Sequence, residues 1–241
     1  MKPVLLIARR ELSSYLRSWT GYIIIAGLLA IDGLMFNAFA LGNGEHRSTE
    51  VLSQFFYFSS GITMAGALLI SMRLLAEERQ TGTLALLYSS PVRDGEIVMG
   101  KFFGALAFLG ILTLVTIYMP LLIMVRGKIS WGHVAGGYFG LMLLGSATLA
   151  IGTLGSAFAK SQVLAIIISA CIWAAMLVMW LLGRVTERPL SEIFTALALH
   201  GIHFQAFQAG IIHLRDVVFY LAVAYVFLFA ATRVLEARRW R

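Results

Sequence analysis

Ionisable side chains inside apolar sequence are the residues that could do chemistry, and Asp32 is the clearest of them. It lies near the middle of residues 20–41, an apolar run long enough to cross a bilayer. A charged group at that depth costs about 2.5–3.5 kcal/mol on insertion scales, so it should face protein or water, with Asn37 one turn further out. Asp32 is therefore a candidate intramembrane polar site for a substrate or a proton. We favour a buried structural hydrogen bond or a protonated acid at a subunit seam, because nothing else forms a relay with Asp32.

Other reactive groups are less informative. His200, His203 and His213 could indicate a metal site, but three histidines without a nearby carboxylate or cysteine set favour a polar rim at the membrane surface. The sequence has no Gly-x-x-x-x-Gly-Lys-Ser/Thr loop to hold nucleotide phosphates. It also has no Ser/His/Asp or His-Glu-x-x-His constellation at a plausible site. We therefore predict that the chain is not an enzyme and carries no cofactor or metal of its own.

The polar segment 76–101 connects two apolar runs, 55–75 and 102–125, and is patterned like a short helix between two breaks. Charged residues end the first run, a Thr-Gly-Thr turn follows, and then comes an apolar face that stops at a proline. Asp94 is expected to cap the next helix, with Glu96 in its first turn. The candidate functional residues of this segment are Glu77, Glu78, Arg79, Gly82, Thr83, Leu84, Leu87 and Pro91.

Composition fixes the class of protein. The chain of 241 residues is 59% hydrophobic and 13% charged, with a mean hydropathy of +0.84, so it is predicted to be an all-α polytopic membrane protein. We treat it as one transmembrane domain, 1–241. The single cysteine, Cys171, can form no internal disulfide. The six predicted spans are residues 20–41, 55–75, 102–125, 134–158, 162–182 and 217–235.

The net charge of +7 could suggest a nucleic-acid partner, but the basic residues cluster beside the apolar runs, as the positive-inside rule describes. That rule places both termini in the cytoplasm. Pro120 should kink the third span. In the fourth, Gly136 and Gly140 favour close packing within the bundle over a specific dimer face.

Two further segments complete the predicted architecture. Residues 1–19 form an amphipathic helix at the inner membrane surface, since its arginines gather on one side. A secretory signal peptide is the alternative, but Asp32 would interrupt its apolar core. Residues 184–215 contain two short apolar helices broken at His200-Gly201, too short to span, and are expected to be re-entrant or interfacial at the outer face. The interface residues expected in the first segment are Arg9, Arg10, Arg17 and Trp19, and those singled out in the second are His203, Phe204, Phe207 and Gly210.

The order of residues in the polar segment resembles a known family. Glu-Glu-Arg-x-x-Gly-Thr-Leu-x-Leu-Leu-x-x-x-Pro-Val from position 77, with Glu-Ile-Val-x-Gly-Lys at 96–101, resembles the coupling loop of type II ABC exporter permeases. The run His-Phe-x-x-Phe-x-x-Gly-x-x-x-Leu-Arg-Asp, 203–216, is similar to a signature of the gliding-motility-associated permease subfamily. The resemblance covers nearly the whole chain.

The resemblance implies a partner and a location. In that family 1–19 would be an elbow helix, and 76–101 would dock into a separate pair of ABC ATPase subunits that bind ATP and magnesium. The eight residues named above in this segment would then be the ATPase-coupling residues, here called the coupling set. Two permease copies, identical or homologous, would pair through spans one and five in the lipid of the bacterial inner membrane. Because Glu77 and Glu78 have little basic sequence around them, we expect at least one to meet a basic residue of the ATPase.

Two other functions stay open at this stage. A membrane scaffold or maturation component, which transmits ATPase strokes to a partner without transport, would need the same coupling segment. An ion-coupled secondary transporter would use Asp32 as its coupling carboxylate, but it should also show an internal repeat, and we find no convincing one.

Overall fold

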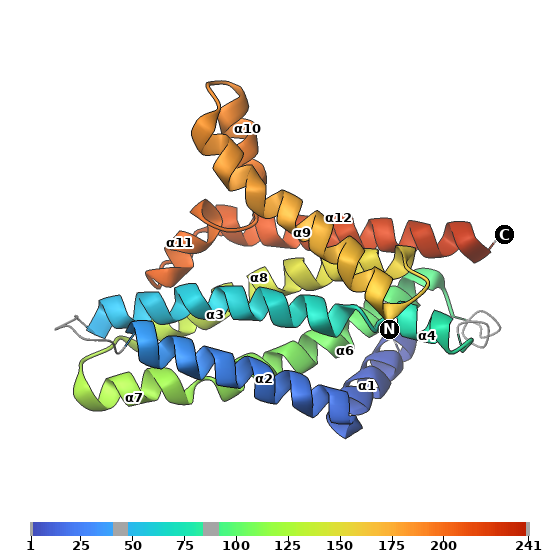
Figure 1. The fold of residues 1–241 in the computed structure, drawn as a ribbon, viewed down its shortest axis with the longest axis horizontal. Helices are drawn as coiled ribbons and strands as arrows, with labels where there is room; N and C mark the ends of the chain where they lie inside the picture. The colour runs from blue at the N-terminus through green and yellow to red at the C-terminus, as the bar shows by residue number, and fades with distance from the viewer. Residues whose placement is uncertain (1, 41–47, 84–91, 240–241) are drawn as a thin grey trace.

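The computed structural model describes residues 2–40, 48–83 and 92–239, and within these ranges the secondary structure is helical, with no strand (Figure 1). The elements are α1 (Lys2–Arg17), α2 (Trp19–Met35), the π-helix η1 (Phe36–Ala40), α3 (Ser48–Ser71), α4 (Ala76–Gln80), α6 (Asp94–Val115), α7 (Tyr118–Arg126), α8 (Trp131–Phe158), α9 (Gln162–Val185), α10 (Leu190–Leu197), α11 (Ile202–Gln208) and α12 (Leu214–Arg239).

Six helical segments of the described chain are long and apolar enough to cross a membrane, which confirms the predicted all-α polytopic class. The segments run from Trp19 to Ala38, Ser48 to Gln80, Asp94 to Val125, Trp131 to Phe158, Gln162 to Val185 and Leu214 to Arg238.

Helix α8 is the centre of the bundle, with 83% of its span buried, and it packs against α3, α6, α9, α11 and α12. Its glycines are what let the other helices come close. A methyl group on Gly137 would lie 2.2 Å from the Phe56 ring, and one on Gly140 would lie 2.5 Å from Phe207 Cβ. Gly136 and Gly140 thus serve close packing within the bundle, as predicted.

The third span is broken where Pro120 requires it. The helix stops at Val115 and resumes at Tyr118, because Pro120 has no N–H for the carbonyl of Thr116 and its ring would clash there. The Thr116 hydroxyl lies 2.9 Å from the Tyr138 hydroxyl, which fixes the break against α8. The predicted kink is confirmed.

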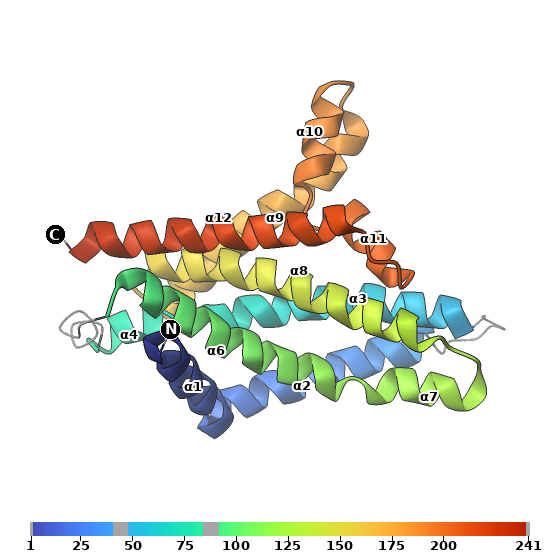
Figure 2. The same ribbon diagram turned by 180° about the vertical axis from the view of Figure 1, so that it is seen from behind.

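Helices α9 and α10 form a hairpin that leaves the bundle. Figures 1 and 2 show α9 diverging from α8 and α12 along its length, with α10 folded back on its far end. Only 11% of the α9 span is buried, against 22% for α2. The break expected at His200-Gly201 is present, with Gly201 at φ +90°, and α11 then packs on α8 and α3.

Different helices lie at the two ends of the bundle. Helices α1 and α4 and the end of α12 lie at one end, while the α7–α8 connection and α11 lie at the other (Figures 1 and 2). Arg238 near the end of α12 donates to the Phe158 carbonyl that ends α8, at 2.8 Å. Both ends of the described chain therefore lie on the same side, as an even number of spans requires.

This arrangement predicts opposite accessibility for Arg93, which precedes α6, and Lys128, which follows α7; both are exposed. In a chain whose native cysteine is removed by Cys171→Ala, Lys128→Cys should react with an impermeant thiol reagent in intact cells. Arg93→Cys should react only after the membrane is permeabilised. Labelling of both sites from one side would contradict the fold, and the reverse pattern would contradict the predicted orientation.

Candidate functional site

The short helix α4 is held at both of its ends by neighbouring groups. The Ser156 hydroxyl of α8 accepts hydrogen bonds from the backbone N–H groups of Leu75 and Ala76, both at 3.0 Å, and so supplies partners that the first turn lacks. At the other end the Thr81 N–H and hydroxyl both donate to the Glu77 carbonyl at 2.9 Å. Gly82 then turns the chain with φ +74°, the left-handed region that favours glycine.

Lys101 of α6 joins three helices at one point. Its Nζ lies 2.7 Å from Glu78 Oε1 of α4 and 3.0 Å from Glu11 Oε2 of α1. The three side chains are 4%, 14% and 16% exposed, respectively. Because ion pairs shielded from water are weakly screened, this cluster, here called the Lys101 junction, binds α1, α4 and α6 to one another. Glu78 Oε2 is buried and makes no hydrogen bond within the described residues.

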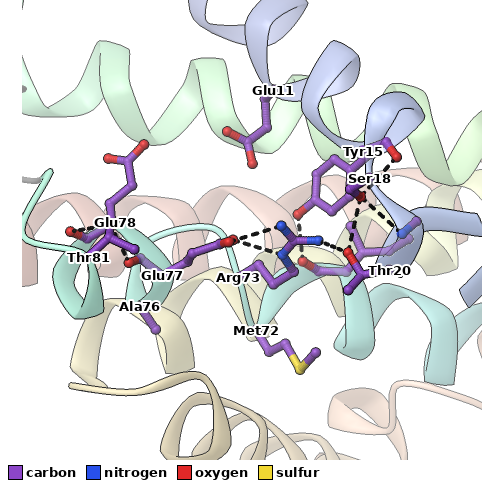
Figure 3. Close-up of polar contacts among 12 residues, drawn as sticks. Glu11, Tyr15, Ser18, Thr20, Met72, Arg73, Ala76, Glu77, Glu78 and Thr81 are labelled. Carbon is purple, nitrogen blue, oxygen red and sulfur yellow. Dashed lines mark hydrogen bonds and ion pairs between the residues drawn. The ribbon is translucent and has the colours of Figure 1, made fainter. Parts of the chain in front are cut away.

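A second set of contacts ties α4 to the start of the chain (Figure 3). Arg73 donates to both carboxylate oxygens of Glu77, at 2.8 and 3.0 Å, and also to the Thr20 hydroxyl of α2. Its guanidinium lies 5.5 Å from the centre of the Tyr15 ring. The Tyr15 hydroxyl donates to the Ile70 carbonyl at 2.8 Å, and burial raises the pKa of Tyr15 well above its usual value, which keeps this donor protonated.

Arg79 connects α4 to the carbonyl end of α8. Its guanidinium donates to the Ala157 carbonyl at 3.2 Å and to the Ala159 carbonyl. A cation at this position satisfies carbonyls that have no partner within the helix and also complements the negative end of the helix dipole. With Ser156, Arg79 makes α4 a fixed extension of α8.

Two glycines explain how α1 can lie against α6. A methyl group on Gly100 would fall 2.7 Å from Ile7 Cβ, and one on Gly104 would fall 2.7 Å from the Ala8 carbonyl oxygen. This small-x-x-x-small spacing was missed in the sequence, although it is a pattern that reports close helix approach. The four predicted membrane-interface residues of this region are exposed: Arg9, Arg10, Arg17 and Trp19.

The structure corrects two details of the sequence reasoning. The expectation that Glu77 and Glu78 lack enough nearby basic residues to pair fully is wrong for Glu77, because Arg73, in the turn that follows α3, pairs with it, and Lys101 of α6 pairs with one oxygen of Glu78. Asp94 is not the cap of α6. Arg93 occupies that position, and its backbone N–H donates to the Glu96 carboxylate at 3.0 Å.

Not every residue of the predicted coupling set can be placed. Gly82 is exposed and Thr83 partly buried, with Thr83 Oγ1 3.0 Å from Thr81 Oγ1. Leu84, Leu87 and Pro91 lie outside the described residues.

The Asp32 carboxylate faces protein, as its position in an apolar run demands. Its two oxygens accept from the Ser59 hydroxyl of α3 at 2.8 and 3.1 Å, and the side chain is buried. The predicted neighbour Asn37 is exposed, and its side chain makes no hydrogen bond within the described residues. Asp32 therefore forms a hydrogen bond between α2 and α3, and no relay with Asn37.

The histidines of the far end are dispersed among separate partners. His203 Nδ1 lies 2.7 Å from Asp216 Oδ1, so the sequence view that no carboxylate is near was wrong for this residue. His200 Nε2 lies 2.8 Å from the Ser60 hydroxyl, and His213 is exposed. Within the described ranges no group of three or more His, Cys, Asp or Glu residues could hold a metal ion.

The remaining residues singled out in this segment line the packing between α11 and the bundle. Phe204 and Phe207 are fully buried, and Gly210 turns the chain with φ +74°. A methyl group on Gly210 would lie 2.6 Å from the backbone of His133. These residues thus hold α11 against α3 and α8.

Residues 5–191 match the family model described as ABC-2 family transporter protein. The chain belongs to the ABC-2 transporter family. Its members are membrane subunits of ABC transporters, so a partner ATPase and a membrane setting follow from membership. No individual curated protein matches the chain.

The matched region of this ABC-2 family protein includes the Lys101 junction, α4 and α9. It ends at residue 191, before the His203–Asp216 run that carried the subfamily resemblance.

The Lys101 junction predicts that the free energy of unfolding depends strongly on its three charges. Lys101→Met should lower the free energy of unfolding by about 3–5 kcal/mol, because it leaves two carboxylates without a cation in a site shielded from water. Arg233→Met, which breaks the exposed pair with Glu236, should cost about 0–1 kcal/mol. The shift of the thermal denaturation midpoint of each purified variant in detergent, relative to the unchanged chain, checks both expectations.

A triple variant separates charge from packing. Lys101→Met combined with Glu11→Gln and Glu78→Gln removes all three charges and should recover most of the lost stability. A midpoint as low as that of the single variant would show that the ammonium acts through its packing alone.

Proposed function

We propose that the chain is the permease subunit of an ATP-driven exporter, which moves a substrate across or out of the bacterial inner membrane using a separate pair of ATPase subunits. The observation that carries this proposal is the anchoring of α4 in the bundle. Five residues are too few to form an independent helix, so α4 moves only with the helices that hold it. Segment 76–101 is thus suited to receive a push at α4 and pass it on.

Three contacts would carry that push into different spans. Lys101 connects Glu78 to α6 and α1. Arg73 connects Glu77 to α2. Arg79 and Ser156 connect α4 to α8. The ATPase would therefore act on the junction of several helices and not on a loop. ATP and magnesium belong to the partner in this proposal, and both ends of the permease lie in the cytoplasm with α4. The run 203–216 supports a place near the gliding-motility-associated permeases.

Gly82 gives the sharpest test of coupling. It is exposed, and a methyl group there would meet nothing within 4 Å, so substitution should leave the bundle intact. A β-branched residue at φ +74° costs on the order of 1–3 kcal/mol of strain, which should redirect the segment that follows. Gly82→Val should reduce ATPase turnover in the complex to the rate of the ATPase alone.

Two variants control this experiment. Gly61→Val, in α3 where a side chain would also meet nothing within 4 Å, should leave turnover unchanged. Gly82→Asn should retain part of the stimulation, because asparagine tolerates the left-handed region better than valine. Full stimulation in Gly82→Val, with unchanged complex yield, would remove the coupling role from this turn.

We also propose that two permease copies assemble over the ATPase pair. The spans with the lowest buried share are α9 and α2, at 11% and 22%, and these are the spans that the family resemblance places at the seam. Native mass spectrometry of the purified complex should give two permeases to two ATPases. One permease for two ATPases would contradict the pairing.

A further inference from the structure

A cavity of about 440 Å³ lies between the α9–α10 hairpin and the bundle, at the end opposite α4. Tyr57 of α3, Leu177, Trp180 and Arg184 of α9, and His200 and Gln205 from the α10–α11 region line it. It has apolar walls together with a few polar groups, the composition of a ligand site. Neither the coupling site nor the proposed export function assigns it a role.

The cavity is fixed by backbone contacts and does not depend on a loose loop. A methyl group on Gly201, at φ +90°, would lie 2.7 Å from Trp180 Cδ1, so glycine is needed for this wall to close. The Ser191 hydroxyl of the α10 turn donates to the Gly183 carbonyl of α9 at 2.6 Å. These contacts hold the hairpin and the start of α11 at a set separation.

Arg184 supplies the positive charge of the cavity. Its guanidinium lies 4.0 Å from the centre of the Trp180 ring, and within the described ranges it forms no ion pair with a carboxylate. The nearby Arg188 is paired with Glu192 at 3.4 Å. Burial lowers the pKa of His200, which stays neutral at pH 7 beside the Ser60 hydroxyl. Arg184 is thus the available cation, with its guanidinium over the Trp180 ring.

The depth of these residues identifies the kind of anion. Arg184 is the second-last residue of the α9 span, where a headgroup lies, and Leu177 is about two turns further into the apolar region. Tyr57 and Trp180 are aromatic residues of the kind found at membrane interfaces. The Gln205 side chain makes no hydrogen bond within the described chain and can donate to an oxygen. A ligand here meets a cation at headgroup depth and an apolar wall below it.

We propose that this cavity binds an anionic glycerophospholipid of the surrounding bilayer, with its phosphate on Arg184 and an acyl chain along Leu177. Bidentate donation by a guanidinium suits a phosphate group, and zwitterionic lipids bring a second, positive charge to the same place. The proposal goes beyond export and does not rest on it. Binding needs neither ATP nor a partner chain.

The test uses the full chain, purified and reconstituted in nanodiscs that contain equal amounts of phosphatidylcholine and phosphatidylglycerol with the same acyl chains. Native mass spectrometry then counts the lipids that stay bound. The wild-type chain should retain phosphatidylglycerol in preference. Arg184→Gln should reduce that preference roughly tenfold, since a hydrogen bond to a charged group is lost.

Matched variants keep the result interpretable. Arg188→Gln removes the same charge from the same end of the molecule but outside the cavity, and should keep the preference. Arg184→Lys keeps the charge without the planar stack and should retain only part of it. The circular dichroism spectrum of each variant should match that of the wild type.

Three results would overturn the proposal. One is an unchanged preference in Arg184→Gln, and another is an equal loss in Arg188→Gln, which would indicate a general surface-charge effect. The third concerns the acyl chain. Soluble sn-glycerol 3-phosphate, added at the lipid's own concentration, should not displace phosphatidylglycerol, and displacement would assign the cavity to a free phosphate compound.

Discussion

The pairing of one buried ammonium with carboxylates from two other helices is the constraint on which the α4 end of this protein depends. Lys101 is almost completely shielded from water, so its charge is tolerated only because Glu11 and Glu78 meet it. The three residues belong to α6, α1 and α4, and no two of them are neighbours in the sequence. The position of α1 against α6, and of α4 against both, is thus fixed by one electrostatic requirement.

Close packing makes that requirement possible to satisfy. Glu11 reaches Lys101 because Gly104 allows the backbone of α1 to approach α6, and a side chain at that glycine would strike the Ala8 carbonyl. The same device operates at α8, where Gly152 would meet the Ser71 hydroxyl and Gly155 the Ser169 hydroxyl if either carried a methyl group. Lipid is as apolar as the side chains, so the hydrophobic effect does not drive helices together in the membrane. Small residues let the helices come close enough for packing and hydrogen bonds to stabilise their association.

Sequence could predict what depends on local pattern. Composition and apolar run length gave the class and the six spans, Pro120 gave the break in the third span, and His200-Gly201 gave the break between α10 and α11. It could not predict which side chains meet across helices. Glu78 looked unpaired because Lys101 belongs to the next helix, and contact between helices is set by packing. The Arg73–Glu77 pair has the i,i+4 spacing that a helix brings together, so the sequence alone could have shown it. Gly100 and Gly104 carried a readable signal that was overlooked in favour of Gly136 and Gly140.

The two ends of the bundle satisfy their polar groups in different ways, and this difference bears on movement. At the α4 end the contacts are ion pairs and charged hydrogen bonds that link α1, α2, α4, α6 and α8. At the other end, one contact to a charged group, between His203 and the Asp216 carboxylate, joins α11 to α12, while neutral bonds such as that from the Ser53 hydroxyl to the Gln208 carbonyl join α11 to α3. Charged hydrogen bonds are roughly twice as strong as neutral ones. A displacement applied at α4 would therefore be shared by the helices bonded to it there, whereas α9, which leaves the bundle, has the lowest buried share of the six spans, at 11%.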